Sequence, residues 1–238
     1  MEEREKIIET FSELSSRYEE VVDSELSTFW GWNYYAFIDF MLDQTKIEEN
    51  ARILDIATGT GVIPRKLTER GNLINPVNAL DITYKMLRNA TKKSSKLGLI
   101  DKFRFTCASA MEMPYKDGAF SLVICGLATH HMNVDELLSE TYRILEDGGR
   151  LVMADVGASP MWRVPGVLFF IRILAFVYFF FKENSSRAWA EAMAVKNIRT
   201  HKDWIEDLKK RGFKDIHVQK LDSKYKWIPS PLLIKAKR

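Results

Sequence analysis

Short apolar runs alternate with segments of helical spacing through the middle of this chain. Five apolar runs predict strands, at residues 52–56, 77–81, 103–106, 120–125 and 150–155. Between them, apolar side chains three and four positions apart predict helices at residues 62–70, 84–97 and 134–145. Strands and helices that alternate in this order are typical of a doubly wound, mostly parallel sheet.

The two ends of the chain add further elements. Residues 2–25 place apolar side chains at helical intervals, with acidic side chains on the opposite face. Near the other end, a helix is predicted over residues 201–211 with Gly212 as its cap, followed by strands at 214–221 and 232–237. The short link between these strands predicts a hairpin in which one strand runs antiparallel. We therefore expect an α/β fold with a seven-stranded, mostly parallel sheet.

The longest apolar stretch, at residues 164–181, departs from this pattern. It is long enough to span a bilayer as a helix. Arg172 would lie near its centre, however, at a cost of about 2.5–3.5 kcal/mol, and a crossing would separate the last strands from their sheet. We therefore predict that it does not span. Two interpretations stay open: a buried lid or subunit contact, and a helix in the plane of a membrane, with basic and aromatic side chains of residues 162–189 at headgroup depth.

An aromatic cluster at residues 29–37 follows the N-terminal helical segment. One interpretation is that it anchors this segment to the core. The other is that it forms a wall of the active site, where rings suit a planar or lipid-like substrate.

Composition limits the classes of protein to consider. With 46% hydrophobic and 28% charged residues, the 238-residue chain is globular rather than disordered. Its formal net charge of +3 gives no strong field for nucleic acid, and the basic residues of 196–238 are interpreted as a solvated face. Cys107 and Cys125 predict buried thiols in a reducing compartment, and no metal-ligand spacing is present. The first six residues resemble neither a signal peptide nor a transit peptide, so we expect a cytoplasmic protein, on its own or on the cytoplasmic face of a membrane.

Candidate chemistry centres on the turn after the first predicted strand. Gly59 and Gly61 have no Cβ, so the backbone can adopt positive φ there and a ligand can approach closely. At the carboxyl end of a parallel strand, such a turn suits a nucleotide-like ligand. A dinucleotide fingerprint needs a third glycine where Pro64 stands. Asp55 would repel a pyrophosphate but suit an ammonium or sulfonium group.

Several motifs, in order along residues 50–155, carry a family resemblance. Asp55-Ile56-Ala57-Thr58-Gly59-Thr60-Gly61, with Asp81 about twenty residues later, resembles motif I of the class I S-adenosylmethionine (AdoMet) methyltransferases. Further similar segments are residues 79–87 (motif II), 108–115 (motif III), 120–132 (strand four and its exit loop) and 140–151 (the glycine turn before strand five). Within the class, residues 81–87 and 110–115 are most similar to the ubiquinone/menaquinone-biosynthesis C-methyltransferase family.

The resemblance implies AdoMet as the cofactor and assigns residues that would bind it. Asp81 would accept hydrogen bonds from both ribose hydroxyls. Ser109 stands where the family has an acid or amide facing the adenine amino group, so a hydroxyl or a backbone group would make that contact. The complete predicted cofactor set is Asp55, Ala57, Gly59, Thr60, Gly61, Asp81, Ile82, Met86, Ser109, Ala110 and Cys125.

The resemblance also divides the chain, predicted as a single methyltransferase domain over residues 1–238. Its parts would be an N-terminal helical lid (1–50), an AdoMet-binding core (51–156), a hydrophobic helical insertion (157–200) and a C-terminal helix with a strand hairpin (201–238).

Methyl transfer from a sulfonium is an in-line displacement whose rate depends mainly on alignment of the reacting atoms. A base is needed only where the acceptor must lose a proton. Candidates are His130 and His131 after the fourth predicted strand, Tyr18 in the N-terminal segment and Asp155 at the end of the fifth strand. The pKa of imidazole suits a phenol or a ring carbon beside one. A purely structural role for the histidine pair stays open.

We expect a methyltransferase that acts on a hydrophobic small molecule, quinone-, lipid- or polyketide-like, since a large exposed apolar patch calls for a partner. A homodimer is a further partner that the apolar segment would allow. Methylation of a macromolecule and non-catalytic AdoMet binding at a membrane are the alternatives. The residues at 126–129, Gly-Leu-Ala-Thr, replace the Asn-Pro-Pro-Tyr-like motif of amino-group methylation, so no nucleic acid partner is expected.

Overall fold

A computed structural model describes residues 2–225 and 228–238. Its strands are β1 (Ile53–Ile56), β2 (Val77–Asp81), β3 (Phe103–Cys107), β4 (Phe120–Gly126), β5 (Leu145–Val156), β6 (Lys214–Lys220) and β7 (Pro231–Lys237). Its longer helices are α1 (Glu2–Leu14), α2 (Tyr18–Phe29), α3 (Tyr34–Asp43), α4 (Val62–Arg70), α5 (Tyr84–Lys96), α6 (Val134–Ile144), α7 (Val167–Lys182), α8 (Ser185–Ala194) and α9 (His201–Lys210).

The strands form one seven-stranded sheet in the order β3-β2-β1-β4-β5-β7-β6. Strands β1 to β5 are parallel, whereas β7 runs antiparallel to both β5 and β6. The doubly wound sheet and the closing hairpin are therefore confirmed. The chain leaves β1 toward β2 on one side and later returns to β4 on the other. This change of direction opens a crevice at the carboxyl ends of β1 and β4, where ligands bind in open α/β sheets.

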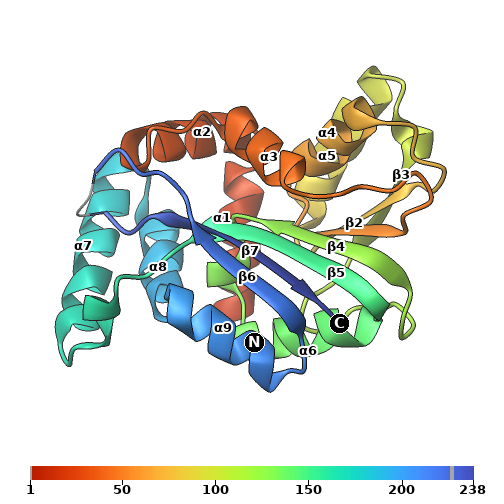
Figure 1. The fold of residues 1–238 in the computed structure, drawn as a ribbon. Helices are drawn as coiled ribbons and strands as arrows, with labels where there is room; N and C mark the ends of the chain where they lie inside the picture. The colour runs from red at the N-terminus through yellow and green to blue at the C-terminus, as the bar shows by residue number, and fades with distance from the viewer. Residues whose placement is uncertain (1, 226–227) are drawn as a thin grey trace.

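Helices cover both faces of the sheet (Figure 1). Successive residues of a strand point to opposite faces, so Ile53 packs in one buried cluster and Leu54 in the other. The first cluster includes α3 and α4 side chains such as Phe37, and the second includes α6 and α9 side chains such as Trp204. Because β1 is buried throughout, its carboxyl end is held rigidly below the glycine turn.

The N-terminal region is more divided than the apolar spacing predicts. The structure has two helices there, α1 and α2, separated by a turn at residues 15–17. Ser15 donates its hydroxyl to the carbonyl of Ser12, a local bond that competes with continued helix formation. Helix α3, which was not predicted, begins after Asn33, whose side chain accepts the N–H groups of Tyr35 and Ala36.

Strand β5 begins earlier than predicted, at Leu145 rather than residue 150. Phe120 of β4 lies opposite Leu145, and Leu122 lies opposite Arg150, so β5 holds extra residues in a bulge. Gly148 has a φ of 76° within this bulge, which its lack of a Cβ permits.

The apolar segment forms α7, which lies at one end of the molecule beside α8 (Figure 1). Among the described residues, no helix has both the length and the apolar character needed to cross a bilayer. Only Phe179 of α7 is buried, whereas Phe170, Leu174 and Phe181 are 63%, 64% and 82% exposed. The buried-lid interpretation therefore fits only one face of α7 in this chain.

The aromatic cluster after α2 packs mainly inward. Phe37 is fully buried, and its ring lies 6.2 Å from the ring of Trp30 and 5.7 Å from that of Trp32. This packing supports the interpretation as an anchor for the N-terminal helices. Phe29 and Trp30 also line a cavity described below, so the active-site interpretation fits part of the cluster.

Candidate functional site

A cavity of about 700 Å³ opens at the carboxyl ends of β1, β2 and β4. Helices α1 and α2 cover it, contributing Phe11 and Tyr18 to its lining. Of the residues predicted to bind cofactor or act in catalysis, the cavity brings together Tyr18, Ala57, Gly59, Asp81, Ile82, Met86, Ser109, Ala110 and His131.

The backbone is strained at two points of this cavity. Ala57 after β1 and Leu127 after β4 have φ values of 54° and 57°, in the left-handed region that side chains with a Cβ disfavour. Such strain concentrates at functional sites because the surrounding structure must maintain it. The two residues turn the chain away from the sheet and leave space for a ligand between the strand ends.

Asp81 ends β2 at the edge of the cavity. One carboxylate oxygen accepts the Gly59 N–H at 2.8 Å, and the other accepts the Thr83 N–H at 2.7 Å. Burial raises the pKa of this carboxyl, while both N–H groups oppose the rise. Each oxygen keeps a further lone pair for a ligand hydroxyl. Asp81 thus ties the glycine turn to β2 and presents an acceptor pair to the cavity.

Four of the predicted cofactor residues do not line the cavity. Asp55 and Cys125 are fully buried in the sheet. Burial, with a smaller effect of the Asp81 charge, raises the pKa of Asp55 to about 8. Gly61 has a φ of 80°, and a Cβ there would lie 3.2 Å from that of Ala90 in α5. Thr60 donates its hydroxyl to Glu19 of α2.

Glu19 connects α2 to the turn and to the helices beneath it. Its carboxylate also accepts from Tyr35, from Lys93 at 2.6 Å and from Arg65 at 3.2 Å. Burial works to raise the pKa of Glu19, but the hydrogen bonds from Lys93, Thr60 and Tyr35 and the Arg65 charge hold it at about 2. The ionised carboxylate therefore fastens the cover of the cavity.

A second cavity of about 300 Å³ adjoins the first. Phe11, Tyr18, Leu127 and His131 line both of them. Its other walls are mainly apolar and include three residues of α7 that face inward: Ile171, Ala175 and Phe179. Ionisable groups interrupt this apolar wall: Asp155 and Arg187 are buried, and Glu25, His130 and Glu191 are partly buried.

His130 lies in the second cavity and is oriented by Asp155. The His130 Nδ1 is 2.7 Å from one Asp155 oxygen. The other oxygen accepts the His130 N–H at 3.2 Å and the Thr129 hydroxyl. Burial works to lower the pKa of His130, but the charge and the hydrogen bond of Asp155 raise it. Because Nδ1 faces Asp155, Nε2 is the nitrogen free to act on a ligand.

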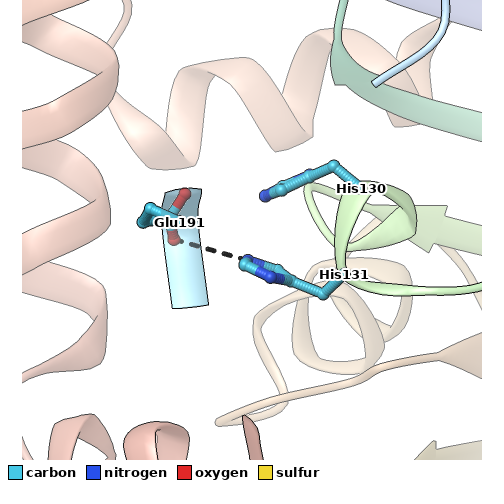
Figure 2. Close-up of side chains that lie close together, drawn as sticks. All are labelled: His130, His131 and Glu191. Atoms are coloured by element: carbon cyan, nitrogen blue, oxygen red, sulfur yellow. Dashed lines mark ion pairs between the residues drawn. The ribbon is translucent and has the colours of Figure 1, made fainter. Parts of the chain in front are cut away.

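His131 lies at the junction of the two cavities. Burial, followed by the neighbouring His130 charge, lowers its pKa. Its Nε2 is 3.4 Å from a carboxylate oxygen of Glu191, and a dashed line marks this pair in Figure 2. Tyr18 lies at the same junction, and burial raises the pKa of its hydroxyl, which therefore stays protonated at neutral pH.

Comparison with known protein families identifies the middle of the chain. Residues 54–153 match the family model described as a methyltransferase domain. The core of this chain is therefore similar to methyltransferase domains. The match runs from β1 to β5 and therefore includes the glycine turn, Asp81 and the histidine pair.

Solved structures agree on the methyltransferase fold. A geranyl diphosphate C-methyltransferase from Streptomyces coelicolor superimposes with a TM-score of 0.66 at 16% identity, over 85% of this chain and 77% of that one. A SAM-dependent methyltransferase from Aquifex aeolicus gives 0.63 at 15% identity, over 94% and 97%. At these identities the likeness establishes the fold.

Curated relatives match less than half of the chain. A ubiquinone/menaquinone biosynthesis C-methyltransferase UbiE from Rickettsia akari is 37% identical over 43% of this chain and 43% of its own length. The UbiE of Brucella abortus is 36% identical over 42% of this chain and 37% of its own length. The matched part therefore spans less than half of these relatives.

Several residues of the candidate site had no recognisable signal in the sequence. Glu25, Arg187 and Glu191 come from α2 and α8, outside the matched core, and reach the histidines only through folding. Arg187 lies 162 positions from its ion-pair partner Glu25. An arginine and a glutamate four positions apart in α8, on an otherwise alanine-rich helix, are the one local hint.

Proposed function

We propose that this protein transfers a methyl group from AdoMet to a hydrophobic small molecule bound in the second cavity. The observation that supports the proposal is the wall shared by the two cavities. Tyr18, Leu127 and His131 line both, so a cofactor in one and an acceptor in the other would meet beside these side chains. Methyl transfer needs this contact between cofactor and acceptor more than it needs any particular base.

The residues of the first cavity fit AdoMet. Its volume of about 700 Å³ lies in the range of cavities that enclose small ligands. Asp81 would accept the ribose hydroxyls, and the Ala57–Gly59 backbone would pass beside the methionine part. Ile82, Met86, Ser109 and Ala110 would surround the adenine. AdoMet supplies an electrophilic methyl group on its sulfonium. Among the structural neighbours, the Streptomyces coelicolor enzyme was solved with S-adenosyl-L-homocysteine.

Two side chains are placed to assist the transfer. His130 would take a proton from the acceptor at Nε2, because Asp155 holds Nδ1 and stabilises the imidazolium that forms. Tyr18 would donate a hydrogen bond to an acceptor oxygen, since its raised pKa keeps the hydroxyl protonated. His131 would complete the wall at the junction.

The walls of the second cavity support a hydrophobic acceptor. Phe29, Trp30, Trp162 and Phe179 are among the residues that line it. By their names, the UbiE relatives act in ubiquinone and menaquinone biosynthesis and the Streptomyces coelicolor neighbour acts on geranyl diphosphate. Ubiquinone, menaquinone and geranyl diphosphate all carry an apolar isoprenoid chain. A quinone-, lipid- or polyketide-like acceptor fits these walls best.

Helix α7 would bring such an acceptor from a membrane. Its inward side chains line the second cavity, while its outward side chains are exposed. We place the outward face on the cytoplasmic surface of a bilayer, where an apolar helix face with aromatic flanks partitions into the headgroup boundary. The acceptor would then enter the cavity without passing through water.

The test is transfer of radiolabel from methyl-labelled AdoMet by the purified protein. Three acceptor preparations are compared: a lipid extract, total RNA and a protein lysate. The proposal predicts a labelled product in the lipid extract that partitions into organic solvent, and its loss with Asp81→Ala. Label in RNA or protein would instead establish macromolecule methylation. If the protein binds AdoMet but no preparation yields a labelled product, its function is AdoMet binding without catalysis.

A further inference from the structure

A cluster of three metal-ligating side chains lies in the wall of the second cavity. Figure 2 shows His130 and His131 pointing from the loop after β4 toward Glu191 on α8. One ligand atom from each of the three residues lies within 4.8 Å of the others. The two imidazole rings have centroids 4.2 Å apart and are tilted by 46°. Within the described parts of the chain, it is the one group of three such side chains whose ligand atoms lie this close together.

The separations suit coordination of one ion. Zinc binds histidine nitrogen and carboxylate oxygen at roughly 2.0–2.2 Å, so neighbouring ligand atoms in a tetrahedral site lie about 3.4 Å apart. The distance from His131 Nε2 to the Glu191 carboxylate is 3.4 Å. The wider separations within the cluster would close through small side-chain rotations.

The hydrogen bonds around the cluster are those that orient metal ligands. The His130 Nδ1 faces the buried carboxylate of Asp155 at 2.7 Å, which leaves the lone pair of Nε2 for an ion. Metal-bound histidines commonly have such a carboxylate partner, which fixes the ring and raises its basicity. Asp155 is itself fixed by the Thr129 hydroxyl. The His131 Nδ1 is buried and has no hydrogen-bond partner among the described residues.

The charge of the cavity wall favours a cation. Three carboxylates line it, from Glu25, Asp155 and Glu191, against the single guanidinium of Arg187. Arg187 lies 3.0 Å from Glu191 and 3.2 Å from Glu25 and so compensates one of these charges. A divalent ion held by neutral histidines would add positive charge beside these carboxylates.

We propose that His130, His131 and Glu191 bind a divalent transition-metal ion, with zinc-like ligand preference. Two imidazoles and one carboxylate leave coordination positions open, and these would face the second cavity. An oxygen of the acceptor could occupy one of them. Metal binding itself does not depend on the proposed methyl transfer; only this use of the open position rests on it. With an ion bound, His130 would act through that ion rather than as a free base.

The test is titration of chelator-treated protein with Co²⁺ and Zn²⁺, followed by visible absorbance for Co²⁺ and by calorimetry for Zn²⁺. We expect one ion per chain and an absorbance in the visible typical of low-coordinate Co²⁺. Glu191→Gln and His131→Gln should each weaken the affinity at least tenfold. His217→Gln, on the exposed strand β6, serves as the matched control and should leave the affinity unchanged.

Two outcomes would overturn the metal site: no binding by the native protein, or affinities in Glu191→Gln and His131→Gln equal to the native one. Glu191 also pairs with Arg187, so Glu191→Gln could lower stability without any effect on a metal ion. Melting curves would identify such an unstable variant, and the conclusion would then depend on His131→Gln. Binding of S-adenosyl-L-homocysteine to chelator-treated protein is measured in parallel. If the protein binds S-adenosyl-L-homocysteine but no metal ion, the metal site fails and the proposed function still stands.

Discussion

Asp81, at the end of β2, is the residue that would join the fold to the ligand. Its two oxygens already accept the N–H groups of Gly59 and Thr83, at 2.8 and 2.7 Å, so the carboxylate cannot rotate away from the cavity. Asp81→Ala removes both acceptors that would hold the ribose. We predict that AdoMet affinity, measured by calorimetry, falls at least tenfold, or about 1.4 kcal/mol.

The same substitution also loosens the glycine turn, so a control is needed. Asp101 is exposed and does not line either cavity, and Asp101→Asn should bind AdoMet as the native protein does. If Asp81→Ala keeps both its melting temperature and its AdoMet affinity, Asp81 does not hold the ribose.

The raised pKa of Asp55 leads us to predict that stability depends on pH. Burial raises its pKa in the folded state to about 8, while the unfolded chain has the ordinary value of 3.8. Between these two values the folded state keeps a proton that the unfolded state has lost. The free energy of unfolding therefore falls as pH rises through this window and is lowest above pH 8.

Asp55→Asn removes this titration while keeping the shape of the side chain. We predict that the free energy of unfolding in urea, taken as variant minus native protein, rises between pH 4.5 and pH 8.5. The rise should be at least about 1.4 kcal/mol, the equivalent of one pKa unit. A difference that stays constant over this range would mean that Asp55 is ionised in the folded protein.

Helix α2 depends on Glu19 for its attachment over the cavity. Four groups from three other parts of the chain converge on this carboxylate. Its lowered pKa means that the stabilisation is complete above the ordinary value of 4.5 and is lost as pH falls toward 2. We predict that Glu19→Gln lowers the free energy of unfolding by about 1–3 kcal/mol at pH 7.

The pH dependence separates a charge effect from a packing effect. The deficit of Glu19→Gln should shrink as the pH approaches 2. Glu20→Gln, on the exposed side of the same helix, should match the native protein throughout. A deficit that is equal at pH 7 and at pH 3 would contradict the assignment to the ionised carboxylate.

The outward face of α7 is proposed to contact a membrane. Phe170, Leu174 and Phe181 are exposed, so changing all three to serine should leave the melting temperature unchanged. We predict that the triple variant loses at least tenfold in co-sedimentation with anionic phospholipid vesicles, whereas Ile74→Ser, at a 72% exposed site elsewhere, does not. If the native protein and the triple variant sediment equally with vesicles and only the native protein forms a dimer, α7 is a subunit contact instead.

Elements with strong local patterns could be predicted from the sequence, and those that depend on distant contacts could not. The strands β1, β2 and β4 are mostly buried apolar runs ending in turn residues, so their bounds follow from the local pattern. The break between α1 and α2 depends instead on a single serine hydroxyl. The early start of β5 depends on a bulge against β4, which local spacing does not encode.

The same division holds for the candidate site. Asp81 and the glycine turn belong to one stretch of alternating strands and helices, which places them together at the sheet edge. Glu191 and Arg187 reach the histidine pair because α8 packs beside the loop after β4. Their spacing of four positions on an alanine-rich helix hints that they pair with each other, but it does not indicate the contact with the histidines. The buried position of Asp55, away from the cavity, likewise depends on how the sheet pairs around β1.

In the molecule as a whole, two cavities with different walls share one boundary. The first is formed by strand ends and is covered by the N-terminal helices. The second lies between those helices and the α7–α8 pair, with charged side chains at its inner end. The core that matches the family model supplies most of the first cavity, and segments outside the match supply most of the second. The acceptor would therefore be selected by the terminal helices and the insertion.

The most direct measurement is a crystal structure of the protein with S-adenosyl-L-homocysteine. The account predicts the ribose hydroxyls within hydrogen-bond distance of Asp81 and the sulfur directed toward Tyr18 and His131, at the boundary of the two cavities. A ligand bound elsewhere, or one whose sulfur points away from the second cavity, would contradict it.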